Sequence, residues 1–286
     1  MDIKDQLIVL SGSTGGLGIP LARKLLKCGA RLLLLDRNRE KSAALKRELL
    51  EEFPDADITL LTADMADFAS VKNAADALSK MPIDVIIFNA GAYSIPRYIC
   101  DTGYDNLFQI NFLSPYYMTR RLLPSLAERG GRVVAVSSIA HNYSKADKND
   151  LDFHTRKRNS LAYGNAKRWL TFSLFSLFEK ETRATLSVTH PGISFTGITN
   201  HYPKLIFALI KHPMKVIFPK PRKACLSIFK GVFEPCRKNE WIGPRIFNIW
   251  GSPKKQRLKT CLEDEYRFIA QKAEEIYSKI EKTAKL

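Results

Sequence analysis

Short apolar runs alternate with longer amphipathic segments between residues 7 and 189. The runs are rich in valine, isoleucine and leucine, as in strands buried on both faces. They lie at Leu7–Leu10, Arg31–Leu35, Ile58–Leu61, Val85–Phe88, Arg132–Val136 and Leu186–Thr189. The helical segments between them are Leu21–Lys27, Arg39–Glu52, Ser70–Ser79, Tyr104–Leu126 and Ala162–Glu179. This alternation predicts an α/β fold with a doubly wound parallel sheet of about seven strands.

The alternation stops after Gly192. The stretch 201–218 is apolar with lysines at intervals and several prolines, which predicts short broken helices. A C-terminal amphipathic helix is predicted by apolar residues at helical spacing, namely Leu258, Leu262, Ile269, Ala273, Ile276 and Ile280. We therefore expect one domain over residues 1–286, with a core at 5–196 and a helical substrate lid and C-terminal extension at 197–286.

The cysteines and the N-terminus bear on the compartment. Five scattered cysteines without C-x-x-C spacing argue against a disulfide framework and favour a reducing compartment. The N-terminus reaches an apolar strand almost at once, and no run approaches the roughly 18 apolar residues of a spanning helix. We expect a cytoplasmic protein that is soluble or peripheral to a membrane.

The formal charge of +16 is unevenly distributed, because no acidic residue lies between Glu181 and Glu234 while eight lysines and arginines do. A solubilising surface and an anionic membrane or substrate contact through the basic lid both explain this excess. The chain has no recognition-helix, zinc-finger or RNP pattern, so we expect no nucleic-acid partner. No group of acidic, histidine and cysteine residues has metal-ligand spacing, so no metal is expected either.

A glycine-rich turn follows the first predicted strand and opens the first helix. It comprises Ser11, Gly12, Ser13, Thr14, Gly15, Gly16, Leu17 and Gly18. Glycines at such a junction let the backbone approach a pyrophosphate, whose charge is met by N–H groups and the helix dipole. Asp36 ends the second strand, where a carboxylate accepts hydrogen bonds from ribose hydroxyls and favours NAD. Arg37 next to it could serve the 2′-phosphate of NADP instead.

The order and spacing of several further motifs resemble the short-chain dehydrogenase/reductase family. These are the glycine turn, Asn89-Ala90-Gly91, Ser138, Tyr163-x-x-x-Lys167 and Pro191-Gly192. The resemblance covers about residues 5–196 and implies a single Rossmann-type fold. The segments around Ser138 and Tyr163 resemble the retinol-dehydrogenase-like branch. Relatives are commonly dimers or tetramers, so the resemblance also implies a homo-oligomer.

The resemblance implies roles for individual positions. Asp64 and Met65 match the adenine contact, and Asn89-Ala90-Gly91 the segment that flanks the cofactor. Asn111 matches the asparagine that holds a water in a proton relay. Ser138 matches the serine that binds the reacting oxygen. The stretch that touches the nicotinamide carboxamide is matched by Pro191, Gly192, Ile193 and Thr196.

Tyr163 and Lys167 have side chains suited to acid–base chemistry. A free phenol has a pKa near ~10, and a neighbouring ammonium lowers that pKa by favouring the phenolate. The two residues are one helical turn apart, so they emerge on one face. We predict Tyr163 as the general acid/base, with Lys167 tuning it and binding ribose.

These residues predict an NAD(P)-dependent enzyme that interconverts an alcohol and its carbonyl compound. Apolar bulk after residue 193 favours a lipophilic small-molecule substrate such as a steroid, bile acid or retinoid. Two alternatives use the same fold, namely a dinucleotide-binding sensor or scaffold without turnover and a reductase of carbon–carbon double bonds. The intact set of Ser138, Tyr163 and Lys167 disfavours the sensor.

Overall fold

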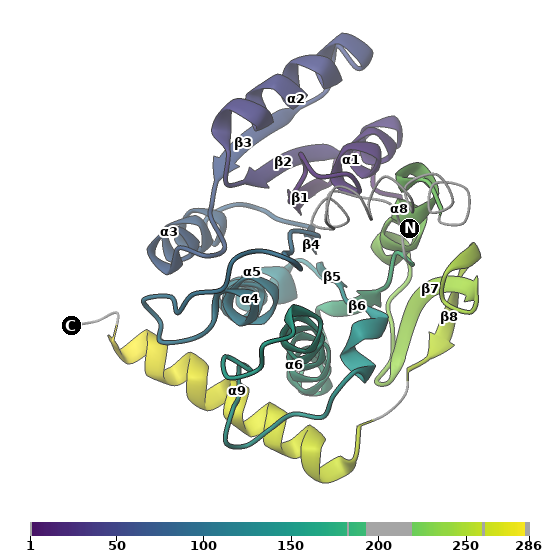
Figure 1. Ribbon diagram of the computed structural model, residues 1–286. Coiled ribbons are helices and arrows are strands. Elements are labelled where there is room, and N and C mark those ends of the chain that lie inside the picture. The colour runs from purple at the N-terminus through teal and green to yellow at the C-terminus, as the bar shows by residue number, and fades with distance from the viewer. Residues whose placement is uncertain (1, 182, 193–218, 259–260, 284–286) are drawn as a thin grey trace, which may run out of the picture.

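An eight-stranded sheet forms the centre of the protein (Figure 1). The computed structural model describes residues 2–181, 183–192, 219–258 and 261–283. The strand order is β3-β2-β1-β4-β5-β6-β7-β8. The strands are β1 (Leu7–Ser11), β2 (Arg31–Asp36), β3 (Ile58–Thr62), β4 (Val85–Phe88), β5 (Arg132–Val136), β6 (Thr185–Thr189), β7 (Glu240–Ile246) and β8 (Trp250–Arg257). The predicted doubly wound parallel sheet is confirmed, and β8 adds an antiparallel edge strand.

The sheet is buried on both faces because successive side chains of a strand point in opposite directions. In β1, Val9 belongs to one apolar cluster, whereas Ile8 and Leu10 belong to the other. Helices α3 (Phe68–Leu78), α5 (Ser114–Glu128), α6 (Asn159–Glu179) and α9 (Glu263–Thr283) contribute to the first cluster. Helices α1 (Gly18–Lys27), α2 (Arg39–Glu52) and α8 (Pro221–Phe233) cover the second. This explains why the strand runs are almost wholly apolar.

The predicted helix at Tyr104–Leu126 is interrupted. It consists of a short α4 (Asn106–Phe108), a π-helical turn η1 (Gln109–Leu113) and α5. Single π turns inserted into α-helices occur frequently at functional sites, and this one contains Asn111. Only a structure could locate it, because the sequence pattern of apolar residues continues through the turn.

The region after residue 192 differs in part from the predicted helical lid. Residues 193–218, which include the predicted short broken helices at 201–218, lie outside the described residues. Residues 221–233 form α8, and the next segment is a β-hairpin of β7 and β8 instead of a lid helix. The hairpin forms because Ile242 pairs with Thr189 and extends the sheet.

The predicted C-terminal helix is present as α9, which begins at Glu263. Its first turn carries Glu263, Asp264 and Glu265, whose negative charge suits the helix N-terminus. Within the described ranges, no helix is long and apolar enough to cross a membrane.

The strand order reverses between β1 and β4, and we call the region at the carboxyl ends of these two strands the crevice. The chain runs outward from β1 to β2 and β3 in one direction, and from β4 onward in the other. Ligands of doubly wound sheets bind at such a reversal of strand order. The glycine turn, Asn89 and Ser138 all follow strands that end at this edge.

Candidate active site

The turn between β1 and α1 leaves no room for side chains at two glycines. A Cβ on Gly12 would lie 2.8 Å from the Cα of Ala90, and a Cβ on Gly18 would lie 2.2 Å from the carbonyl oxygen of Gly12. Gly12 also has a positive φ of 66°, which glycine adopts without strain. Among the described residues, no side chain caps the α1 N-terminus at Leu17. The uncapped helix end therefore fits an anion such as a pyrophosphate.

Asp36 is buried and bound by the chain's own donors. Its Oδ2 accepts from the hydroxyls of Ser13, at 2.5 Å, and Ser42, at 3.0 Å. Its Oδ1 accepts from the backbone N–H and the hydroxyl of Thr14, both at 3.3 Å. These four bonds tie the glycine turn to β2 and α2. The carboxylate predicted to bind ribose is thus already engaged within the protein.

The Ser11 hydroxyl and the Asn89 side-chain amide form hydrogen bonds that join the ends of β1 and β4. The Ser11 hydroxyl accepts from the backbone N–H groups of Asn89 and Ala90, each at 3.0 Å. The Asn89 amide donates to the carbonyls of Ser11 and Gly12, at 3.1 and 2.9 Å. The predicted segment Asn89-Ala90-Gly91 therefore lies against the glycine turn and fixes the width of the crevice.

Ser138 and Tyr163 lie together at the end of β5. Ser138 is the N-cap of the 3₁₀ turn η2 (Ile139–Asn142), and its hydroxyl accepts from the N–H of Ala140 at 3.2 Å. The Ser138 side chain lies near that of Tyr163 on α6, close enough to act on the pKa of the Tyr163 phenol. Gly164 allows this approach, because a Cβ there would lie 2.3 Å from the carbonyl oxygen of Ala140.

Lys167 lies one turn after Tyr163 and is buried. Its Nζ donates to the carbonyl of Val136 at 2.8 Å and lies 5.7 Å from the centre of the Tyr163 ring. A Cβ on Gly91 would lie 3.6 Å from the same Nζ, so the ammonium faces the segment after β4. The structure thus brings Ser138, Tyr163 and Lys167 together beside the crevice.

Burial shifts the pKa values of Tyr163 and Lys167 in opposite directions. Burial raises the pKa of Tyr163 to about 12, although the nearby Ser138 side chain opposes the shift. Burial lowers the pKa of Lys167 to about 7. Burial is the largest cause of both shifts, and the Lys167 ammonium is directed at a carbonyl. That the ammonium lowers the pKa of the phenol stays a prediction for the protein with its ligand bound.

Asn111 in the π turn is bonded to the backbone around the crevice. Its amide donates to the carbonyls of Ala92 and Leu107, at 2.8 and 2.9 Å, and its Oδ1 accepts from the N–H of Ala92 at 3.3 Å. The side chain therefore holds the segment after Gly91, and both of its amide protons are already used. A water in a relay would therefore have to donate to Oδ1, which accepts only one bond, or bind a main-chain atom.

The other predicted cofactor contacts follow strand ends. Asp64 and Met65 come after β3, and the Asp64 carboxylate accepts from the N–H of Ala66 at 2.9 Å. Gly192 has a positive φ of 81°, and a Cβ there would lie 3.0 Å from the carbonyl oxygen of Ile249. Ile193 and Thr196 lie outside the described residues.

Sequence reasoning missed three supports of this site. Tyr93 contacts the Tyr163 ring edge-on, with ring centres 5.1 Å apart. His141 lies under Ser138, with Nδ1 2.6 Å from the Ser138 carbonyl oxygen. Arg168 forms two bonds of 2.6 Å with Glu265, which connects α6 to α9. The only signal in the sequence is proximity to a predicted motif: Tyr93 follows Asn89-Ala90-Gly91, whereas His141 and Arg168 follow Ser138 and Lys167.

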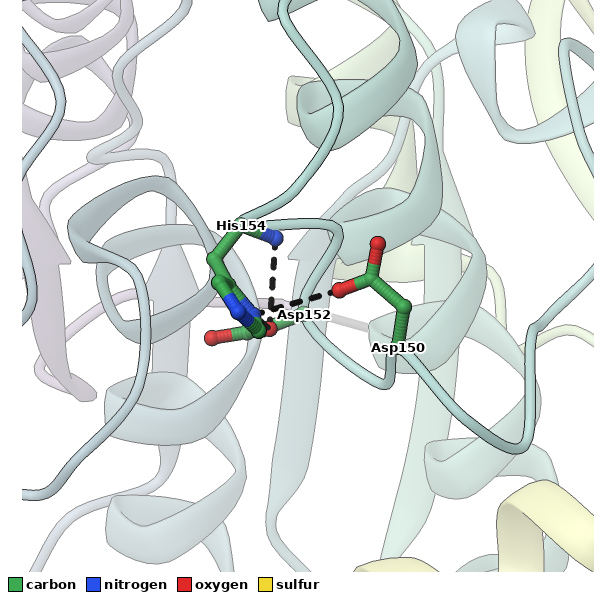
Figure 2. Close-up of side chains that lie close together, drawn as sticks. All are labelled: Asp150, Asp152 and His154. Carbon is green, nitrogen blue, oxygen red and sulfur yellow. Dashed lines mark hydrogen bonds and ion pairs between the residues drawn. The ribbon is translucent and has the colours of Figure 1, made fainter.

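A histidine lies between two carboxylates on the loop before α6 (Figure 2). His154 Nδ1 is 2.9 Å from Asp152 Oδ1 and 3.2 Å from Asp150 Oδ1. These three side chains have metal-ligand atoms within 4.8 Å of one another, although the sequence predicted no such group. The hydrogen bond to Asp152 raises the pKa of His154. Asp152 also accepts from the N–H of Asp105 at 2.7 Å, so the cluster joins two loops.

Comparisons with known proteins decide the family. Residues 6–148, half of the chain, match the model of the short chain dehydrogenases. The chain belongs to the short-chain dehydrogenase/reductase family. This confirms the resemblance found in the motifs and assigns the protein to a family of oxidoreductases.

The individual relatives have low sequence identity to this chain. The short chain dehydrogenase rstn4 of Aspergillus nomiae is 30% identical over 214 residues, which cover 68% of this chain and 58% of that protein. Retinol dehydrogenase 13 of Homo sapiens is 27% identical over 210 residues, or 70% of this chain and 62% of that protein. The chain therefore matches less than two thirds of either relative. A crystal structure of an uncharacterized protein from Mycobacterium Paratuberculosis is 23% identical, covers 97% of this chain and 95% of that one, and has a TM-score of 0.77.

Proposed function

We propose that this protein is an alcohol dehydrogenase or carbonyl reductase that uses a nicotinamide dinucleotide. The observation that carries the proposal is that the side chains of Ser138 and Tyr163 lie close together, with Lys167 on the same helix face as Tyr163. Two hydroxyls that converge beside a nucleotide crevice suit one substrate oxygen, which must gain or lose a proton.

The residues around the crevice fit a dinucleotide. The side-chain-free backbone at Gly12 and Gly18 and the uncapped α1 N-terminus would hold the pyrophosphate. Ser13, Thr14, Gly16 and Leu17 complete this turn. The adenine would lie by Asp64 and Met65, and the nicotinamide by Asn89-Ala90-Gly91 and Pro191-Gly192, which lead toward Ile193 and Thr196. When bound, the dinucleotide supplies or accepts the hydride, while the protein manages the proton.

Each residue near the reacting oxygen has a distinct task. Ser138 donates a hydrogen bond that orients the substrate oxygen. Tyr163 gives its proton to that oxygen during reduction and removes it during oxidation. Lys167 binds the ribose and, when charged, makes removal of the Tyr163 proton easier. The two directions need opposite protonation states of Tyr163, so oxidation should gain more from high pH than reduction.

Asn111 is a positioning residue in this proposal. Its bonds to Ala92 hold the segment that begins at Gly91. Gly91 lies beside both the Asn111 amide and the Lys167 ammonium. Loss of the Asn111 amide would therefore displace the part of the crevice that faces Lys167. A water relay would use the Asn111 Oδ1 or a main-chain atom here, because the amide protons are occupied.

We assign the choice between NAD and NADP to Arg37 instead of Asp36. The Asp36 carboxylate already accepts four hydrogen bonds, so ribose hydroxyls would have to displace a donor. Arg37 is exposed at the end of β2, where a 2′-phosphate would lie. Arg37→Ala should weaken NADP binding about tenfold and leave NAD binding unchanged. Titration of each dinucleotide into both proteins measures this, and an equal loss for both would remove Arg37 from this role.

A lipophilic alcohol or carbonyl compound is the substrate class that we propose. Two tyrosines, Tyr93 and Tyr143, lie near the Tyr163 hydroxyl and offer apolar rings to a substrate. The name of the relative retinol dehydrogenase 13 supports the same class. A panel of lipophilic alcohols, ketones and enones, with product analysis, would also detect reduction of carbon–carbon double bonds.

Tyr163→Phe tests the proposed chemistry. The variant keeps the ring against Tyr93 but has no proton to transfer, so turnover should fall by about 10²–10⁴-fold. Dinucleotide affinity should remain within about twofold, because binding relies on the glycine turn and Lys167. Undiminished turnover with bound cofactor would exclude Tyr163 as the acid/base. Loss of cofactor binding by the Phe variant would point to a structural role instead.

A further inference from the structure

The β7–β8 hairpin lies at the edge of the molecule (Figure 1). Phe247 at its tip is 82% exposed, and its neighbours Ile246 and Trp250 are 43% and 36% exposed. Ile246 and Trp250 are paired across the two strands, so all three side chains cluster at one end of the hairpin. Isolated exposed apolar residues are ordinary, but a cluster of them marks an interaction surface.

The turn that carries Phe247 is strained. Phe247 and Asn248 have positive φ values of 50° and 57°, and the N–H of Ile249 donates to the carbonyl of Ile246 at 2.9 Å. Positive φ at both central residues is typical of a type I′ turn, which favours Asn-Gly. A bulky residue is unusual in this conformation. Glycine would relieve the strain, so the phenylalanine has no benefit for the turn itself.

Basic side chains follow the apolar tip along both strands, from Arg245 beside the tip to Arg257 opposite Glu240 at the base. Arg245, Lys254, Lys255 and Arg257 belong to the hairpin strands and are exposed. Within the described residues, none of these four forms an ion pair. The sequence contains no acidic residue between Glu240 and Glu263. The hairpin therefore carries four basic side chains and one acidic side chain, Glu240, which lies at the end away from the apolar tip.

We propose that the hairpin tip docks on an anionic lipid bilayer. Aromatic side chains suit the boundary between headgroups and acyl chains, and each lysine or arginine near the surface gains from the negative potential. A second copy of the chain fits less well. β8 is an edge strand, but Pro253 and two lysines on it are features that block pairing between edge strands.

Docking through this tip would place the membrane near the candidate active site. The Asn248 carbonyl oxygen lies 3.1 Å from Nε2 of His190, and Gly192 packs under the carbonyl of Ile249. The turn is thus joined to the segment that leads from β6 past the crevice. The proposal concerns where the protein binds and does not depend on the reaction proposed above.

Vesicle flotation of the full chain tests the surface. Wild-type protein should float with vesicles that contain phosphatidylserine, and salt should weaken its binding. Phe247→Gly should lower the partition coefficient about tenfold, yet keep or raise the melting temperature because glycine accepts the positive φ. The double variant Lys254→Glu/Lys255→Glu should lose at least about tenfold.

A matched control separates the hairpin from overall charge. Lys41→Glu/Arg47→Glu changes the charge equally on exposed positions of α2, beyond the opposite half of the sheet. This variant should bind within about twofold of the wild type. The proposal is overturned if neutral vesicles bind the protein equally well, if no vesicle binds it, or if Phe247→Gly binds like the wild type.

Two further measurements complete the test. Sedimentation without lipid would overturn the lipid assignment if it showed a dimer that Phe247→Gly dissociates, because the tip would then bind a second copy. Dinucleotide titration should give wild-type affinity for every hairpin variant. Failure of vesicle binding with normal dinucleotide binding would reject only the docking surface and leave the proposed oxidoreductase intact.

Discussion

Two buried charged groups flank the crevice, and their surroundings are opposite. Asp36 accepts four hydrogen bonds from Ser13, Thr14 and Ser42. Lys167 donates to the carbonyl of Val136, and among the described residues no carboxylate forms an ion pair with it. Burial accordingly lowers the pKa of Lys167 to about 7.

This difference separates a residue that stabilises the fold, Asp36, from one that takes part in the proposed chemistry, Lys167. The Asp36 carboxylate receives its hydrogen bonds from the chain itself, so these bonds should stabilise the fold with or without a ligand. The Lys167 ammonium forms no ion pair with a described carboxylate, as expected for a charged group whose partner is a bound ligand. Three experiments test this difference between Asp36 and Lys167.

Lys167→Met should have the largest effect, and only on activity. Turnover should fall by roughly 10²-fold because Tyr163 loses its neighbouring charge. The free energy of unfolding should stay unchanged or rise, because an apolar chain of similar length replaces a buried amine. Steady-state kinetics and urea denaturation measure the two effects. A large loss of stability would show that Lys167 holds the fold and would end the contrast with Asp36.

Asp36→Ala should destabilise the protein by about 2–4 kcal/mol, because it leaves the hydroxyls of Ser13 and Ser42 and the Thr14 N–H without their acceptor. Urea denaturation measures this loss. Asp57→Ala is the matched control at the next strand. It removes a half-exposed partner of Arg31 and should cost under about 1 kcal/mol. Equal losses for both variants would contradict the structural role of Asp36.

The smallest effect concerns the pH dependence of dinucleotide binding. Lys167 in the free protein is charged below its pKa of about 7 and neutral above it. If the ligand binds the charged form, binding takes up a proton above that pKa, and affinity falls as pH rises. We expect a loss of about tenfold between about pH 6 and about pH 9. Titration calorimetry in buffers of different ionisation enthalpy detects the proton, and Lys167→Met should show a flatter profile.

The predictability of the chain differs between its two halves. The strands up to β6 follow from apolar runs, because a buried strand must be apolar along its whole length. The β7–β8 hairpin was expected to belong to a helical lid, because it follows the last predicted cofactor contact. Pairing of Ile242 with Thr189 made it part of the sheet. That contact is between residues far apart in the sequence, and no local pattern encodes it.

The candidate site shows the same division. The order and spacing of Ser138, Tyr163 and Lys167 indicated which side chains would meet, because strand ends and one helix face are readable locally. Three features were not predictable in this way: the hydrogen bonds that Asp36 accepts, the π turn at Asn111 and the raised pKa of Tyr163. Each depends on which donors, carbonyls and apolar groups the fold packs around the residue.

The sequence by itself determined the family, the sheet and the identity of the groups that can exchange a proton, because these follow from periodicity and motif order. Only the tertiary structure decided which buried charges are compensated and where an apolar tip meets basic residues. Solvation and hydrogen bonding depend on neighbours in space, and most of those neighbours are distant along the chain.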